Sequence, residues 1–592
     1  IKMTWGEKVN NYVARSRAGK YFQLEGSGAR RERKNTRFLT EIRAGFTTFF
    51  AMAYIISVNS AIISDSGGTC VCEGTADDPV CDNNSEYLIC INEFRVQLIA
   101  GTAITCCIAC ILFGIMANLP IGLAPGMGLN AYFTYTVVGY HGTGNISYRT
   151  AMGAVFIEGF IFLILTILGI RQWLARLIPM SIKLGISVGI GLFLCFVGLQ
   201  SSEGIGLVGS DPATLVALGG CPAIMKDATG ACLGGKMESP TLWMGILGLL
   251  IMSILMLYRV RGALLLGIIF IAITSWPRVS EVTLFPYTEA GQNMFDYFKQ
   301  VVKVQPLDRI LAQFEFDLSA SETWVALITF LYVDILDTTG TLYSMARYGG
   351  YMDKHGDFER SSMAFLSDAI SIIIGSCFGC SPVTAYVESG AGIAEGGRTG
   401  ITAITIGFGF FISVFFSPIF ASFPPWATGG ALVIVGSMMA SSARTINWDY
   451  PGDSIPAFIT IAVMPFTYSI SYGIVGGVIA YIIINTFVWL MEKITFGKLK
   501  PDYSKREPYW EMIRGRPLLP IYMRYLVAKV QGKPFNWHED EHEFSDDEDN
   551  SEESSKRSNE KDDEDYPTQV VTTNGVTGNG TRHETINEKV TS

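Results

Sequence analysis

The chain has 592 residues, of which 49% are hydrophobic and only 17% are charged, and its mean hydropathy is +0.32. The formal net charge of -10 comes from loops and from the C-terminal tail, so it does not describe the apolar part of the chain. This composition excludes an ordinary soluble enzyme, which would show amphipathic periodicity, and it argues against nucleic acid as a partner.

Long apolar runs recur from Ala44 to Leu490. Each run has about 17 to 25 residues, which is enough to cross the hydrocarbon core of a bilayer as a helix. We therefore predict an all-α polytopic membrane protein with about 14 transmembrane segments, embedded in a lipid bilayer.

The two ends of the apolar region are basic. Arg30–Lys34 precede the first span, and Lys493, Lys498 and Lys500 follow the last. By the positive-inside rule, both termini are expected in the cytoplasm, which fits an even number of crossings. No short apolar signal region precedes the first span, so no cleavable signal peptide is expected.

Cysteines mark two loops that should lie outside the cell. The loop after the first span contains Cys70, Cys72, Cys81 and Cys90, and a later loop contains Cys221 and Cys232. Several cysteines in an exposed loop indicate disulfides, although the sequence leaves the pairing of the first four open. The six other cysteines lie in or beside spans, where small packing residues are expected.

The eighth span carries two carboxylates, Asp334 and Asp337, inside an apolar stretch. A charged group near the bilayer centre costs roughly 2.5 to 3.5 kcal/mol on insertion scales, so such residues usually face protein, water or a ligand. Residues three apart lie on one helix face, so both acids can point to the same place. The structural alternative is a polar pair that only joins helices.

Two other spans are short and interrupted by glycine and proline. The third reads Pro120–Tyr132 and contains Asn130, and the tenth reads Ser381–Gly392 and contains Glu388. Fourteen spans divide into seven plus seven, and an odd number of spans per half inverts the second half. Matching broken segments in two inverted repeats indicate the binding site of a transporter. The alternative is two kinked helices packed through small residues.

The remaining boundaries follow from composition. The sequence predicts a cytoplasmic N-terminal segment (1–40), segments one to six of the first repeat (41–260), segments seven to fourteen including the second repeat (261–500), a cytoplasmic interfacial helix (501–535) and a disordered acidic tail (536–592). Arg and Lys alternate with apolar residues in the interfacial helix, for which core packing is the alternative. Acids and serines dominate the tail.

Acids and amides dominate the polar residues inside the membrane. Asn130, Asp334, Asp337 and Glu388 form the predicted substrate site, which suits a neutral or cationic ligand rich in N–H donors. Tyr132, Phe133 and Tyr386 offer ring faces for stacking, and backbone breaks should free further N–H groups. No catalytic residue, metal or cofactor is predicted.

Buried carboxylates can also take up protons. Asp334, Glu388 and Glu158 are the candidates for proton coupling, and the sequence does not decide among them. Asp368 lies near a helix end, where a structural role is favoured.

Three motifs, Ala124–Phe133, Val333–Leu342 and Ser381–Gly400, make the chain resemble the azaguanine-type purine permeases of the nucleobase-cation symporter family. The cysteine loop and acidic tail are similar to those of fungal members. The resemblance implies a seven-plus-seven inverted repeat with core and gate domains, and plasma-membrane uptake of hypoxanthine, adenine and guanine with protons by an elevator-type movement. It assigns Asn130, Asp334 and Glu388 to substrate binding or coupling, with Asp337 close to the purine.

Several alternatives stay open. The site could serve another nucleobase, or a small anion on the same fold, and a channel is a further option. An intramembrane aspartyl protease also uses two aspartates, but its Tyr-Asp and Gly-x-Gly-Asp motifs are missing from spans eight to ten, so we predict no enzyme. Elevator-type relatives are often dimers, which makes a homodimer one expectation.

Overall fold

The computed structural model describes residues 5–496 except 73–80, 82–83, 170–178, 201–203, 212–213, 223–224, 226–231, 261, 318 and 353–357; beyond 496 it describes only 505, 506 and 529. The predicted interfacial helix therefore lies almost entirely outside the described residues. The predicted acidic tail lies wholly outside them.

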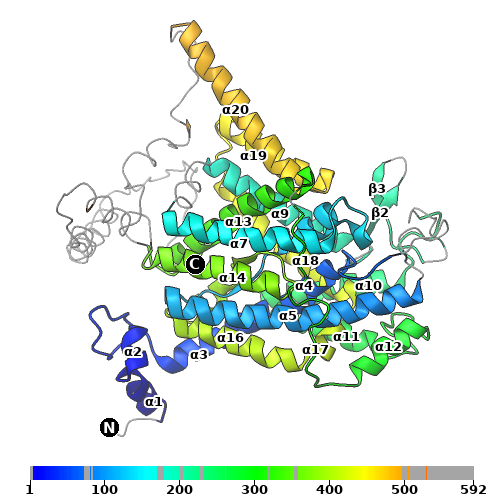
Figure 1. Ribbon diagram of the computed structural model, residues 1–592, viewed down its shortest axis with the longest axis horizontal. Helices are drawn as coiled ribbons and strands as arrows, with labels where there is room; N and C mark the ends of the chain where they lie inside the picture. Colours follow the sequence, from blue (N-terminus) through cyan, green and yellow to red (C-terminus); the bar gives the residue numbers. More distant parts are fainter. Residues whose placement is uncertain are drawn as a thin grey trace, which may run out of the picture. The chain divides into compact units, whose positions relative to one another are not determined.

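Helices make up most of the described chain (Figure 1). The elements up to residue 257 are α1 (Trp5–Ala14), α2 (Arg17–Tyr21), α3 (Phe38–Met52), α4 (Ile55–Ser64), α5 (Ser85–Ala117), β1 (Leu123–Pro125), α6 (Met127–Ala131), the π-helix η1 (Tyr132–Val138), η2 (Tyr140–Gly142), α7 (Tyr148–Leu168), α9 (Met180–Leu199), β2 (Val208–Asp211), β3 (Leu215–Leu218) and α10 (Pro240–Leu257). The later elements are α11 (Ala263–Ser275), α12 (Glu289–Phe298), α13 (Ser321–Tyr348), α14 (Ser361–Cys377), β4 (Val383–Ala385), α15 (Ser389–Ala394), α16 (Gly400–Phe415), α17 (Ser417–Ala421), α18 (Pro425–Ala440), η4 (Ser441–Thr445), α19 (Pro451–Thr467) and α20 (Ile470–Ile494).

Eight helical stretches of the described chain are long and apolar enough to cross a membrane. Three shorter apolar helices, α11, α14 and α16, accompany them. The chain is thus a multi-pass membrane protein, as its sequence predicts. The number of about fourteen crossings and the seven-plus-seven repeat stay predictions, because the broken segments and the shorter helices fall below the length of a regular span.

The helices form two sets by their contacts. The first, here called the site set, contains α3 to α7 and α13 to α16; α5 runs beside α16, and α7 packs on α13 and α14 (Figure 1). The second, here called the flanking set, contains α9 to α11 and α18 to α20, with α9 against α18 and α19.

Glycines allow α5 and α16 to approach closely. A Cβ atom on Gly400 would lie 1.9 Å from the carbonyl oxygen of Gly114, and one on Gly114 would lie 2.5 Å from the oxygen of Gly400. Small residues at such crossings are typical of membrane helices, which associate through close packing. The site set is therefore a tightly packed body.

The predicted disulfides are confirmed, and the structure also gives their pairing. Cys70 bonds Cys90, Cys72 bonds Cys81, and Cys221 bonds Cys232. The six remaining cysteines are free, and four of them are fully buried. The Cys70–Cys90 bond joins the loop after α4 to the first turns of α5.

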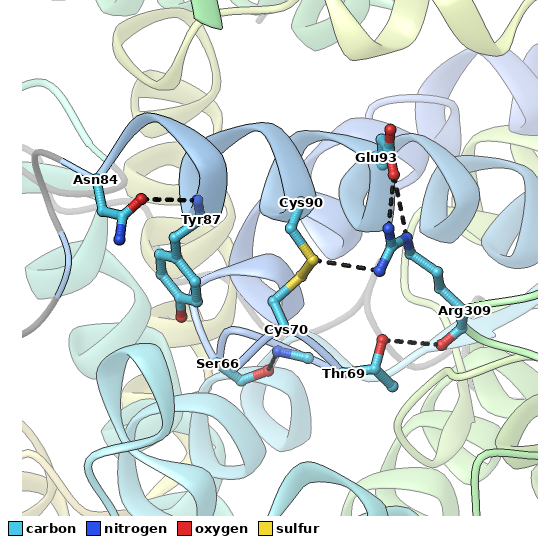
Figure 2. The surroundings of a disulfide bond; sticks show 9 residues. Ser66, Thr69, Cys70, Asn84, Tyr87, Cys90, Glu93 and Arg309 are labelled. Carbon is cyan, nitrogen blue, oxygen red and sulfur yellow. Dashed lines mark hydrogen bonds and ion pairs between the residues drawn. A yellow bond between two sulfur atoms is a disulfide. The ribbon is translucent and has the colours of Figure 1, made fainter. Parts of the chain in front are cut away.

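The segment before α13 binds to this disulfide (Figure 2). The Arg309 guanidinium donates to the Glu93 carboxylate at 2.8 Å and to the Cys90 sulfur at 3.3 Å. The hydroxyl of Thr69 donates to the Arg309 carbonyl at 3.4 Å. Arg309 thus attaches the long loop between α12 and α13 to α5 through its side chain and to the loop after α4 through its backbone.

Candidate functional site

The two broken segments meet as a short antiparallel strand pair, β1 and β4, here called the crossing strands. Strand β1 pairs with β4, with Ala124 opposite Thr384 and Pro125 opposite Val383. The N–H of Gly126 donates to the carbonyl of Pro382 at 2.9 Å, and α6 and α15 begin just beyond their strands. Short strands inside the apolar region are a difference from the all-α prediction.

The cause of this difference is backbone pairing. Proline and glycine interrupt both segments, so their backbone groups cannot form helical hydrogen bonds, and groups buried away from water must find partners. The two segments supply each other's backbone hydrogen-bond partners. For example, the Tyr386 N–H donates to the Gly122 carbonyl at 3.1 Å. The prediction that the breaks free N–H groups for a ligand therefore holds only in part.

Asn130 lies on α6 and is fully buried. Its Oδ1 accepts a hydrogen bond from the hydroxyl of Ser381, the first residue of the second broken segment. One side-chain bond thus joins the two broken segments. It also orients the Asn130 amide, because a fixed Oδ1 places the two N–H donors of the same group.

Glu388 is the N-cap residue of α15 and is buried, with 6% of its surface exposed. Its carboxylate does not cap the helix; instead, Oε1 accepts a bond of 2.8 Å from the hydroxyl of Tyr54, between α3 and α4. The other oxygen, Oε2, has no hydrogen-bond partner among the described residues. A buried carboxylate oxygen without a protein partner is costly unless a ligand, a proton or water satisfies it.

The helix α13, which carries Asp334 and Asp337, contacts β4, α6 and α15. Asp334 is fully buried and accepts a bond of 2.9 Å from Thr338, one turn later. Asp337 is only half-buried. Its charge interacts with Asp368 of α14, and Tyr386 interacts with both Asp337 and Glu388.

The predicted aromatic residues differ in how they lie. Phe133 is fully buried, with ring centroids 5.7 Å from Tyr148 and 6.1 Å from Phe330, so it supports the wall of the site. Tyr132 meets Phe330 edge-on at 5.2 Å. The hydroxyl of Tyr386 donates to the carbonyl of Pro125, which fixes its ring beside the crossing strands.

The last predicted residue, Glu158, is fully buried on α7. This helix packs against α13 and α14, which carry Asp334, Asp337 and Asp368. All predicted site acids therefore belong to the site set, although Glu158 comes from a helix beside the crossing strands.

Sequence reasoning missed three residues that hold the site side chains: Tyr54, Thr338 and Ser381. Tyr54 could have been predicted as a candidate, because a tyrosine inside an apolar span needs a hydrogen-bond partner for its hydroxyl. Thr338 lies four residues after Asp334, the spacing of a helical pair. Nothing in the sequence indicates that Ser381 would reach Asn130.

One contact between the two helix sets involves Tyr468, which lies between α19 and α20. Its ring lies 5.6 Å from that of Tyr135 on η1, and its carbonyl accepts a bond of 3.3 Å from the hydroxyl of Thr136. Tyr135 in turn donates to Asp65 at 2.8 Å, and Tyr468 donates to Gln200 at 2.9 Å. We call this group the Tyr468 contact.

The arrangement combines buried carboxylates, a primary amide and aromatic rings around two crossing strands. Carboxylates accept hydrogen bonds, and the amide of Asn130 both donates and accepts. Such a set matches the edge of a planar heterocycle with N–H donors and ring-nitrogen acceptors better than it matches an anion.

Known proteins resemble the chain over most of its length. Residues 84–476 match a family model described as "Permease family" and named for xanthine/uracil permeases. A Schizosaccharomyces pombe protein, provisionally named a xanthine/uracil permease, is 52% identical over 88% of this chain and 84% of its own. An Aspergillus versicolor protein named an efflux pump, notK', is 53% identical over 91% and 94%.

More distant relatives include the Bacillus subtilis guanine/hypoxanthine permease PbuO, which is 35% identical over 76% of this chain and 92% of its own. Among solved structures, the transmembrane domain of the cyanobacterium bicarbonate transporter BicA aligns with 74% of this chain and 97% of its own. Its sequence identity to this chain is 13% and its TM-score is 0.45.

Proposed function

The chain belongs to this family of nucleobase permeases, and we propose that it carries the purine nucleobases hypoxanthine, guanine and adenine across the plasma membrane together with protons. Its relatives are permeases, which supports a transporter rather than an enzyme. The named substrate of PbuO, guanine/hypoxanthine, supports the choice of purines.

The observation that best supports this proposal is the hydrogen bonding of the buried Glu388 carboxylate. One of its carboxylate oxygens is held by Tyr54, and the other has no described partner although the residue is buried. A purine N–H group would satisfy that oxygen. The amide of Asn130 would bind a second position on the ring edge, and Asp337 would lie close to the purine.

Proton coupling would use the same carboxylates. A buried acid that is protonated loses its charge, so substrate and proton can compete for it or stabilise each other there. Asp334 and Glu388 are the first candidates, and Glu158 on the neighbouring α7 is the third. We propose Asp334 as indispensable and Asp337 as a residue that tunes which purine fits.

We propose that the site set moves as one body against the flanking set, with both termini in the cytoplasm. This would be the core and gate arrangement of an elevator-type transporter built from a seven-plus-seven inverted repeat. Two separate helix sets and close packing inside the site set support this reading. A homodimer would form through the flanking set.

The direction of transport has a second candidate. The A. versicolor relative is named an efflux pump, which favours export of a small molecule as an alternative to import. Import with protons and export would use the same site, and they differ in how the proton gradient drives net movement.

Uptake of radiolabelled hypoxanthine into a purine-transport-deficient cell tests the proposal, with adenine, guanine, xanthine and uracil as competitors. We expect accumulation that adenine and guanine inhibit and a protonophore abolishes. Equilibration without accumulation would indicate a channel. Faster loss of preloaded substrate from expressing cells would indicate export, and competition by uracil alone or by chloride would contradict a purine site.

A further inference from the structure

The N-terminal segment, residues 5–37, folds onto the site set. The Oδ1 of Asn10 on α1 accepts a bond of 3.0 Å from the N–H of Leu39, in the first turn of α3. Ala14 and Leu24 are buried against Ile401 of α16. The first helix of the chain is therefore attached to the point where the first apolar span begins.

Two side chains attach the rest of this segment to other helix ends. Arg33 donates to the carbonyl of Asn118 at 2.9 Å and to that of Arg398, and forms an ion pair with Glu359 at 3.4 Å. The hydroxyl of Tyr21 donates to the carbonyl of Ile115 at 2.5 Å. The segment thus contacts the end of α5 and the loops before α14 and α16, all in the site set.

The opposite face of α1 is open. Trp5 and Tyr12 are 76% and 81% exposed, and Lys8 and Arg15 are also exposed. At 3.6 residues per turn, these four positions fall within about 80° of the helix circumference. Large aromatic rings left in water are unfavourable, whereas aromatic and basic residues together on one face are typical of helices at a membrane surface.

The charge of the whole segment agrees with this reading. Residues 5–37 contain nine basic residues and only three acidic ones. One of these acids, Glu32, is engaged by the backbone N–H groups of Gly26 and Gly28, which hold the pKa of its carboxyl below the usual range. A second acid, Glu7, lies on α1 away from the arc of Trp5 and Tyr12.

The position of α1 favours a membrane surface, and not bulk water, as the environment of its exposed face. Because Asn10 bonds the first turn of α3, α1 is held beside the start of the first apolar span. We propose that α1 lies on the inner-leaflet surface and binds anionic phospholipid through Trp5, Lys8, Tyr12 and Arg15. The sidedness rests on the proposed cytoplasmic location of the N-terminus. Since the segment is attached to the site set, lipid bound there acts on the helices that carry the substrate site.

The test uses the full chain reconstituted in vesicles of phosphatidylcholine with or without phosphatidylserine. Tyr12→Cys carries a fluorophore, and quenching by a spin-labelled lipid reports contact of position 12 with the membrane. Glu7→Cys, on the other side of α1, is the matched control, and the parent chain corrects for labelling of native cysteines. The assay involves no substrate, so its failure is distinguishable from failure of the proposed function.

We expect strong quenching at position 12, increased by phosphatidylserine, and weak quenching at position 7. Adding Lys8→Gln and Arg15→Gln should lower the phosphatidylserine-dependent quenching at position 12 by roughly tenfold or more, because each basic residue near an anionic surface adds to binding. Equal quenching at the two positions, or no response to phosphatidylserine, would overturn the proposal.

Discussion

Tyr54 and Glu388 are separated by 334 positions in the sequence, yet the tyrosine hydroxyl donates a hydrogen bond of 2.8 Å to the glutamate carboxylate. Both side chains are buried. The bond fixes the direction of the carboxylate and satisfies one of its oxygens, so the other is the one that a ligand would meet.

We expect Tyr54→Phe to weaken uptake without removing the protein from the membrane. A hydrogen bond to a charged group contributes about 1.5 to 3 kcal/mol, so the ratio of maximal rate to KM should fall by roughly tenfold to a hundredfold. Initial rates of purine uptake measure this. Tyr258→Phe, which removes a hydroxyl from an exposed residue, is the matched control; equal rates in the two variants would mean that Tyr54 does not orient Glu388.

The three acids of the proposed substrate site should differ in their importance. Asp334→Ala and Glu388→Ala are expected to abolish uptake while surface expression stays intact, because removing a partner from a buried charged contact costs about 2 to 5 kcal/mol. Asp337→Asn, at a half-buried position, should instead change the ranking among hypoxanthine, adenine and guanine. Normal accumulation of hypoxanthine by either alanine variant at the cell surface would show that the site is assigned wrongly.

The broken segments could be predicted because proline and glycine interrupt their apolar pattern, and Asn130 and Glu388 stand out there as polar residues. The aspartates of α13 stand out for the same reason. These are local signals, readable within a few turns of chain, and they located the elements that the structure brings together.

The partners of these residues could not be predicted. Ser381 reaches Asn130 across 251 positions, and the pairing of β1 with β4 joins segments equally far apart. A single sequence does not show which distant positions lie close together in the fold. Asp368 shows the same limit, because nothing in the sequence indicates that Asp337 is its neighbour in space.

The crossing of α5 and α16 should be sensitive to one added methyl group. Gly400→Ala places a Cβ atom against the backbone of Gly114, where neither helix can yield without separating. Overpacking of this kind costs about 1 to 3 kcal/mol, or more where backbone is the obstacle. Thermal unfolding in detergent should show a lower midpoint. Gly340→Ala, at a helical glycine with open space around it, is the control and should leave the midpoint almost unchanged.

The Tyr468 contact joins the two helix sets, so holding it closed should stop any movement between them. In a Thr136→Cys and Tyr468→Cys double variant, a short thiol cross-linker should abolish uptake, and a reducing agent should restore it, because the Thr136 hydroxyl already lies 3.3 Å from the backbone carbonyl of Tyr468. A cross-link between Tyr87→Cys and His141→Cys, whose rings lie 5.1 Å apart within the site set, should leave uptake largely intact. The parent chain shows what the reducing agent does to the native disulfides. Undiminished uptake by the fully cross-linked 136–468 variant would exclude movement of the site set against the flanking set at this contact.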